Sequence, residues 1–351
     1  MVEDNHMSRK KPFFPITAPL RKFLRKQGRE KRLNLHYQDL LQHALSTALL
    51  DKTGRDTLWE TVHYEPERTA ALNRALTHIY VLLRNEGDLS AMEHLSVERI
   101  DYCSFGNSNP FRIRIVNRYN DNYDYFYIKT ADASRIYGLE LEHLLSPNRI
   151  SYFVDGDTLI EEHIAGIPGD QFIASWLDQR QTNRVRLAKE FVKFNERCFV
   201  RLLGDMRSYN YVLDITPDFD DVQYRIRAID FDQECFEGRA RLYMPQYFKE
   251  NNPLVKLCME LINERTMLQY QSEERSLIAR RLIASRYEVL DLINCMRADC
   301  ISTDDKVAQL RDELAEHHQN PEFRKCLGMG DVLKLHLKCM LQGHIRRLRD
   351  F

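Results

Sequence analysis

The sequence predicts an α+β chain in which a small antiparallel sheet precedes a mostly helical half. Glycine and proline are scarce, at 13 and 11 of 351 residues, and so few turn-forming residues argue against sandwiches, barrels and propellers. Short alternating apolar segments occupy part of the first half, whereas the spacing from Leu254 to Arg349 is almost everywhere that of amphipathic helices. The length allows two or three packed units.

Charge and cysteine content narrow the class of protein. The 51 Lys and Arg residues nearly balance the 52 Asp and Glu residues, so the bulk charge indicates no specific nucleic-acid partner. No apolar run reaches the ~20 residues of a membrane span, and no secretory signal is recognisable at the start. The eight cysteines are scattered without metal-binding spacing. We therefore expect a cytoplasmic protein with reduced thiols; the oligomeric state is left open.

Residues 1–33 are predicted to form a basic arm. Between positions 7 and 33 ten lysines and arginines stand against one acid, Glu30, with phenylalanines and leucines interleaved. Such a segment can act as a peripheral contact for an anionic surface, such as a membrane face. The alternative is a solvated arm that packs its few apolar residues on the main body.

The rest of the chain is predicted as three regions. Residues 34–95 are expected to form a helical extension, with Pro66 opening a helix and Gly87 closing it. A small sheet lobe is expected over 96–165, followed by a helical lobe over 166–351. The strands are predicted at 97–102, 111–116, 124–129, 150–154, 158–164, 211–215 and 224–229, and the first helices after the extension at 134–145 and 170–200.

The residues that carry chemistry follow the long helix. Asp205 and Asn210 lie five positions apart on a predicted loop, and Asp230 ends the hairpin that follows. Phosphoryl transfer needs a carboxylate that orients the attacking hydroxyl and oxygen ligands that hold Mg²⁺ on a triphosphate. Asp205 is therefore the candidate catalytic group, and Asn210 and Asp230 are candidate metal ligands. Asp232 either assists the metal or caps the next segment.

These motifs resemble the aminoglycoside phosphotransferase and choline kinase branch of the protein-kinase-like superfamily. The catalytic loop of that branch reads H-G-D-x-x-x-x-N and its metal motif reads I-D-F/W-E/D. Here residues 203–210 read L-G-D-M-R-S-Y-N and residues 229–232 read I-D-F-D. The resemblance covers about residues 97–235 and implies a two-lobed kinase-like fold that uses ATP and Mg²⁺.

Two positions of the catalytic loop bear on activity. Arg207 lies where related enzymes place a His or Lys near the transferred phosphate, so the resemblance implies that it stabilises developing charge. Leu203 replaces the family histidine, and we expect the loss of a hydrogen bond that would relax the loop.

The same resemblance assigns the phosphate-binding residues. Gly106, Asn107, Ser108 and Asn109 look like the loop that covers the phosphates, although with a single glycine; the alternative is a simple hairpin turn. Lys129 looks like the phosphate-anchoring lysine; the alternative is a solvated lysine on an edge strand.

A glutamate that would pair with Lys129 and residues that would contact the adenine complete the predicted nucleotide site. Glu140 would orient Lys129 as an ion pair, with Glu142 as the alternative because helix register is uncertain by a residue or two. Backbone groups from Glu162 to Ile164 would bond the adenine edge, and Val212 would line the apolar floor.

The resemblance implies an ATP- and Mg²⁺-dependent phosphotransferase acting on a hydroxyl of a small molecule or sugar. The alternatives are a catalytically weak kinase-like protein that binds nucleotide or a partner, and a lipopolysaccharide-core-type sugar kinase at a membrane face. Glu196, Arg201, Glu234 and Tyr243 are candidates for the acceptor site, against the interpretation that each is a packing or surface residue.

Overall fold

The computed structural model describes residues 11–51, 53–84, 89–105, 108–219 and 222–349. The chain divides into two compact units. The first, here called the sheet unit, contains Gln27–Asp132, Ser151–His163 and the described residues up to Ile16. The second, the helical unit, contains Thr17–Lys26, Ala133–Ile150 and the described residues from Ile164 onward.

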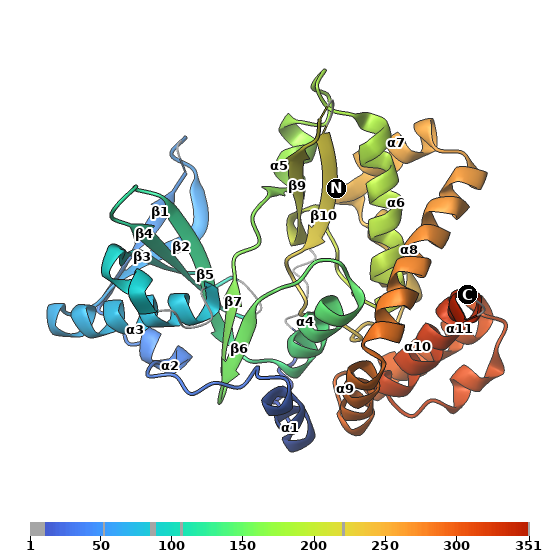
Figure 1. The fold of residues 1–351 in the computed structure, drawn as a ribbon, viewed down its shortest axis with the longest axis horizontal. Helices are drawn as coiled ribbons and strands as arrows, with labels where there is room; N and C mark the ends of the chain where they lie inside the picture. The colour runs from blue at the N-terminus through green and yellow to red at the C-terminus, as the bar shows by residue number, and fades with distance from the viewer. Residues whose placement is uncertain (1–10, 52, 85–88, 106–107, 220–221, 350–351) are drawn as a thin grey trace, which may run out of the picture. The chain divides into compact units, whose positions relative to one another are not determined.

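The sheet unit is built on a seven-stranded antiparallel sheet of order β1-β2-β3-β4-β5-β7-β6 (Figure 1). The predicted strands from 97 to 164 correspond to five of these, β3 to β7, with ends that differ by up to two residues. The strands are β1 (Leu45–Leu50), β2 (Asp56–His63), β3 (Leu95–Tyr102), β4 (Phe111–Asn117), β5 (Tyr123–Thr130), β6 (Tyr152–Asp155) and β7 (Thr158–Glu162).

The prediction of a wholly helical extension over 34–95 is wrong, because β1 and β2 lie inside it and enlarge the sheet. The tight turn between them depends on Asp51, whose carboxylate accepts N–H groups of Thr53 and Arg55, and on Gly54 at a φ of 81°. Among the described residues of this range, the α-helices are the short α2 (Tyr37–Leu40) and α3 (Pro66–Arg84). Helix α3 begins at Pro66 as predicted, whereas Gly87 lies outside the described residues.

The core of the sheet unit comes from strand alternation. Phe111, Ile113 and Ile115 of β4 are buried together with residues of α3, while Arg112 and Arg114 point to the opposite face. There the guanidinium groups stack on aromatic rings of the same sheet. The guanidinium carbon lies 4.4 Å from the ring centroid for Arg112 over Trp59 and 4.0 Å for Arg114 over Tyr123. The apolar members of the core include Leu72, Leu76, Ile79, Leu83, Phe126, Ile128 and Ile160.

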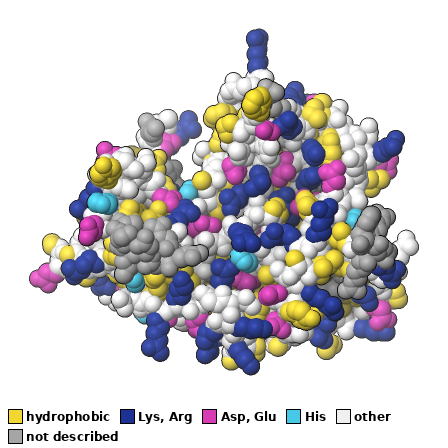
Figure 2. Space-filling view, in the orientation of Figure 1, with side chains coloured by type: hydrophobic (Ala, Val, Ile, Leu, Met, Phe, Trp, Pro, Cys, Tyr) yellow, Lys and Arg dark blue, Asp and Glu magenta, His cyan; other side chains and the backbone are white. Residues whose placement is uncertain are grey.

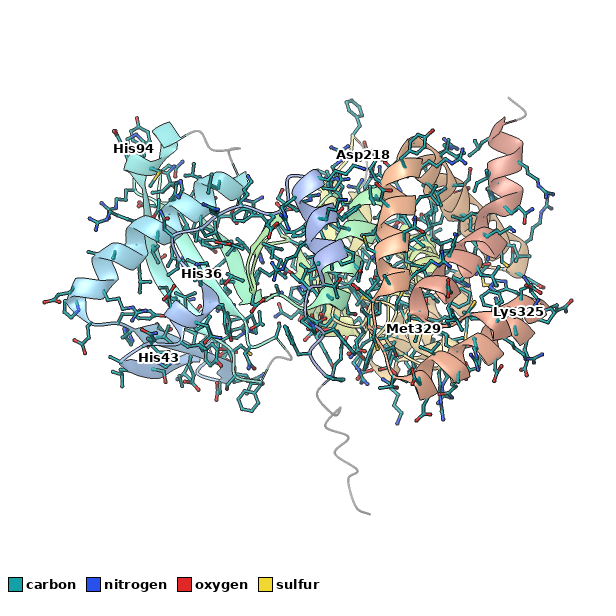
Figure 3. The ribbon with its side chains drawn as sticks, turned by 90° about the horizontal axis from the view of Figure 1, so that it is seen from below. His36, His43, His94, Asp218, Lys325 and Met329 are labelled. Atoms are coloured by element: carbon teal, nitrogen blue, oxygen red, sulfur yellow. The ribbon has the colours of Figure 1, made fainter. Side chains whose placement is uncertain are left out.

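The helical unit combines a small antiparallel sheet of order β10-β9-β8 with helices (Figure 1). Its strands are β8 (Ile167–Pro168), β9 (Tyr211–Pro217) and β10 (Val222–Ala228). Its α-helices are α1 (Ala18–Lys26), α4 (Ala133–Leu145), α5 (Gly169–Ser175), α6 (Arg184–Arg201), α7 (Asn252–Leu261), α8 (Glu264–Ala284), α9 (Arg286–Ala298), α10 (Asp304–His317) and α11 (Met329–Arg349), where Met329 is labelled in Figure 3.

Helix α6 forms the centre of this unit and packs on α7, α8 and α11. The Asn183 side chain caps its first turn by accepting the N–H of Arg186. Its buried Arg197 donates to Glu274 of α8 at 2.7 Å and lies 3.4 Å from Glu190. The predicted helix over 170–200 is thus two helices, α5 and α6, separated by residues 176–183.

A buried histidine links α11 to the end of α6. His336 is fully buried; its Nε2 lies 2.9 Å from the carbonyl oxygen of Phe199, and its Nδ1 lies 2.9 Å from Nε2 of His318. Loss of solvation lowers the pKa of His336 to about 3, because a charged imidazole is disfavoured there. This histidine is therefore neutral in the folded protein throughout the physiological pH range.

The neutral His336 makes stability depend on pH. Below about pH 6.5 the unfolded chain takes up a proton that the folded chain refuses, so the free energy of unfolding should fall by up to ~1.4 kcal/mol per pH unit. We expect His336→Gln to be less stable than wild type at pH 7.5 but to lose less stability between pH 7.5 and 5.5 in urea titrations. Equal slopes in wild type and His336→Gln would contradict the assignment.

Candidate active site

The predicted catalytic loop leaves α6 through a sharp turn. Leu202 follows the helix in the left-handed conformation at a φ of 60°, and Asp205 adopts it again at 56°. This conformation costs a non-glycine residue of order 1 kcal/mol or more, so surrounding contacts must hold it. Backbone bonds provide them: the N–H of Gly204 donates to Gln233 and the N–H of Cys235 donates to Leu202.

The β9–β10 hairpin brings the metal motif to this loop. Tyr211 pairs with Ala228 at the end of the ladder, and the next bond runs from the N–H of Ile229 to the carbonyl of Asn210 at 3.0 Å. The side-chain nitrogen of Asn210 donates to the carbonyl of Asp205 at 2.7 Å. Asp230 is close enough to Asp205 to affect the pKa of its carboxyl group. Asp205, Asn210 and Asp230 therefore lie together in the helical unit.

The Asp205 carboxylate is partly desolvated. Burial raises its pKa to about 6, and the charge of Asp230 adds to the rise, while the nearby Arg207 opposes it. The guanidinium of Arg207 donates from Nε to Asp205 at 2.8 Å and from Nη1 to Glu250 at 2.7 Å. Arg207 thus fixes the orientation of Asp205, and its predicted contact with a transferred phosphate stays a prediction.

The donor set fits Mg²⁺, which prefers oxygen ligands. Asn210 uses its amide nitrogen to hold the loop, which leaves the amide oxygen as the atom that can act as a ligand. The side chain of Asp230 keeps 30% of its surface exposed, so a hydrated ion can reach it. Within the described ranges no cluster of three or more His, Cys, Asp and Glu residues could hold a metal. The candidate set therefore depends on an amide as well as carboxylates.

Asp232 is engaged by an arginine that the sequence did not single out. Nη1 of Arg135, on α4, donates to Asp230 and to Asp232, at 2.9 Å in each case. Nη2 of the same guanidinium is 3.3 Å from the carbonyl oxygen of Ile229. The side chain of Asp232 is only 8% exposed. Arg135 would therefore compete with a metal ion for the Asp232 carboxylate, and the metal-assisting role of Asp232 stays a prediction.

Leu203 is buried, and its backbone pairs with Glu234 in an isolated antiparallel bridge. Its apolar side chain is unable to make the hydrogen bond expected of a histidine at this position. The predicted relaxation of the loop stays a prediction, and the backbone bonds of the neighbouring residues hold the loop in the absence of that histidine.

Lys129 lies in the sheet unit, on the interior strand β5. It is buried, and its Nζ donates to Glu161 of β7 at 2.7 Å, so the alternative of a solvated edge lysine is wrong. Glu140 and Glu142 are buried on α4 of the helical unit, where Glu142 is ion-paired with Arg201. The pairing of Lys129 with Glu140 stays a prediction.

The other predicted nucleotide contacts are placed unevenly. Gly106 and Asn107 lie outside the described residues. Ser108 and Asn109 belong to the β3–β4 connection, where Asn109 has a φ of 41° and its carbonyl accepts the hydroxyl of Tyr37 at 2.8 Å.

The backbone groups that are assigned to the adenine edge, from Glu162 to Ile164, are partly used by the protein itself. The N–H of Glu162 donates to Ser151 at 3.0 Å, so this donor is not available to an adenine as predicted. Ile164 is buried in the helical unit. Val212 is buried on β9, where Gly166 lets the chain pass: a Cβ there would lie 2.8 Å from the Val212 side chain.

The acceptor-site candidates all have partners within the helical unit. Glu196 is ion-paired with Arg275, and Arg201 with Glu234 at 3.1 Å. The hydroxyl of Tyr243 donates to a backbone carbonyl at 2.6 Å. All four candidates are buried, so these contacts favour the packing interpretation over acceptor binding.

The described part of the basic arm belongs partly to each unit. Helix α1 buries Leu20, Phe23 and Leu24 and contacts α9, and Lys26 is 2.6 Å from Asp291. These contacts agree with an arm that packs its apolar residues on the body.

Acidic and basic side chains are interspersed on the face drawn in Figure 2. Among the helices of the described residues, none is both long and apolar enough to cross a bilayer.

No family model matches the sequence, and no match was found among the curated proteins. Support for a function therefore comes from the site residues themselves.

Helix α4 packs tightly on the metal motif through Gly138. A Cβ at this position would lie 2.8 Å from Cβ of Phe231 and 3.2 Å from its carbonyl oxygen. Glycine is normally unfavourable in the middle of a helix, where Gly138 lies. The local sequence pattern does not show which segment packs against it.

Gly138→Ala should therefore lower the free energy of unfolding by about 1–3 kcal/mol, because the overpacking exceeds the gain in helix propensity. Gly343 is the matched control: it also lies inside a helix, α11, but a Cβ added there would have nothing within 4 Å. Gly343→Ala should raise stability by up to ~1 kcal/mol. Urea unfolding measures both, and an equal gain in the two variants would contradict the close packing of α4.

Proposed function

We propose that this protein is an ATP- and Mg²⁺-dependent phosphotransferase that acts on a hydroxyl group of a small molecule or sugar. The observation that carries the proposal is the meeting of Asp205, Asn210 and Asp230, which the loop and the hairpin bring together and whose oxygen groups are of the kind that phosphoryl transfer uses. Helix capping and turn formation do not call for this combination of groups.

The roles follow from the contacts. Asp205 accepts the hydrogen bond of the acceptor hydroxyl and orients it for attack, and its desolvated carboxylate is a stronger base than an ordinary aspartate. Arg207 holds that carboxylate through Nε and is itself held by Glu250. Asn210 and Asp230 would hold the Mg²⁺ that neutralises charge on the triphosphate.

Lys129 is proposed to contact the phosphates of the nucleotide, as the resemblance implies. Its ammonium donates to Glu161 at 2.7 Å. A buried lysine paired in this way is positioned as a point charge and loses little further freedom when it meets an anion.

A second candidate is a kinase-like protein that binds nucleotide with little turnover. The ion pair between Arg207 and Asp205 supports it, because the guanidinium occupies one oxygen of the group that would orient the acceptor. The alternative of a lipopolysaccharide-core-type sugar kinase at a membrane face stays a prediction.

Substitution of the two acids tests the proposal. With Mg²⁺ and ATP, Asp205→Asn should reduce phosphate transfer or ATP turnover by at least about 100-fold, because a positioned base contributes that much. Asp230→Asn should lose the Mg²⁺-dependent thermal stabilisation by ATP. Asp218→Asn is the control, since this acid is exposed at the end of β9 (Figure 3) and should leave both readouts unchanged.

The outcomes separate the two candidates. Nucleotide-dependent stabilisation that is lost in Asp230→Asn, together with turnover no higher in wild type than in Asp205→Asn, would favour the binding protein. Turnover that is equal in wild type and in both site variants, with no stabilisation by nucleotide, would rule out both.

A further inference from the structure

The arginine that engages both acids of the metal motif has a consequence for metal binding. Arg135 is 2% exposed, and one of its nitrogens bridges an oxygen of Asp230 and an oxygen of Asp232. An arginine side chain stays protonated in proteins. A fixed positive charge therefore lies between the two carboxylates, where a cation shared by them would otherwise lie.

The two acids are not equivalent. The side chain of Asp230 is 30% exposed and lies beside Asp205 and Asn210, whereas that of Asp232 is 8% exposed and faces Arg135. The N–H of Asp232 also donates to the carboxylate of Asp230 at 3.0 Å, which closes a tight turn around the guanidinium. Asp230 can thus reach an ion from solvent, and Asp232 is committed to the interior.

Helix α4, which carries Arg135, is anchored beside the two acids by other residues. Ser134 donates to the carbonyl of Glu234 at 2.7 Å, Gly138 is packed against Phe231, and Glu142 is ion-paired with Arg201. These anchors recur every four residues, so they lie on one face of the helix; the first two contact residues 231–234 and the third contacts Arg201 of α6. The backbone of Arg135 is therefore fixed beside the two acids, and its guanidinium is buried between them.

We propose that Arg135 takes the place of a second metal ion, so that the site binds one divalent cation through Asp230 and Asn210 while Asp232 serves as the counter-ion of Arg135. The inference rests on the proposed function, because it concerns the metal of that same site. A second divalent ion would need Asp232 as a ligand and would meet the repulsion of the guanidinium at close range.

The test counts bound Mn²⁺ per full-length chain, by electron paramagnetic resonance of the free ion, in the presence of a non-hydrolysable ATP analogue. Wild type should bind one Mn²⁺ and Arg135→Gln two, because the second pair of carboxylate oxygens becomes available. The double variant Arg135→Gln with Asp232→Asn should return to one. Arg275→Gln is the control: it removes an arginine that pairs with a single carboxylate, Glu196, and it should still bind one.

Two Mn²⁺ ions in wild type would overturn the inference and leave the proposed function standing. One Mn²⁺ in a folded Arg135→Gln would also overturn it, since removal of the guanidinium would then have opened no site. Absence of both Mn²⁺ and nucleotide binding in wild type would overturn the proposed function together with the inference. If Arg135→Gln does not fold, the wild-type count decides alone, with one supporting the inference and two contradicting it.

Discussion

The attachment of α4 to residues 229–235 is the interaction on which the candidate site depends. Two arginines make it: Arg135 reaches from the helix to Asp230 and Asp232, and Arg201 reaches from α6 to Glu142 and Glu234. Buried ion pairs add little net stability compared with apolar contacts, but the loss of one partner is costly because it leaves a buried charge uncompensated. The pairs therefore hold one geometry firmly, and α4 is fixed as part of the helical unit.

Helix α6 carries this constraint to the catalytic loop. Arg197 and Arg201 lie one turn apart, and they bind carboxylates on α8 and on the segment after Asp230 respectively. The chain then turns through Leu202, whose carbonyl accepts a backbone bond from that same segment. The unusual backbone of Asp205 is thus maintained by contacts on both sides of it. These backbone bonds hold the loop, although Leu203 offers no side-chain hydrogen bond.

Elements with a clear local pattern could be predicted from the sequence. The alternation of β4 and the proline start of α3 predict these elements correctly. Strands β1 and β2 are not predicted, because helical spacing flanks them and the segment between them holds a single glycine, Gly54. Asp205, Asn210 and Asp230 could be brought together from spacing, since a hairpin separates them. Their partners could not: they lie far along the chain and carry no local pattern. Arg135 is 97 residues from Asp232, Glu250 is 43 from Arg207, and Glu161 is 32 from Lys129.

The charges of the candidate site are consistent with a single divalent ion. Asp205, Asp230, Asp232 and Glu250 contribute four negative charges, since a pKa of about 6 still leaves Asp205 mostly ionised at pH 7. Arg135 and Arg207 contribute two positive charges within the same hydrogen-bonded set, which leaves a formal charge of −2. Glu237, which also acts on Asp205, is neutralised by Lys306 at 3.0 Å. One Mg²⁺ would balance this formal charge of −2. Two would give the protein part of the site a net positive charge, which only the nucleotide phosphates could offset.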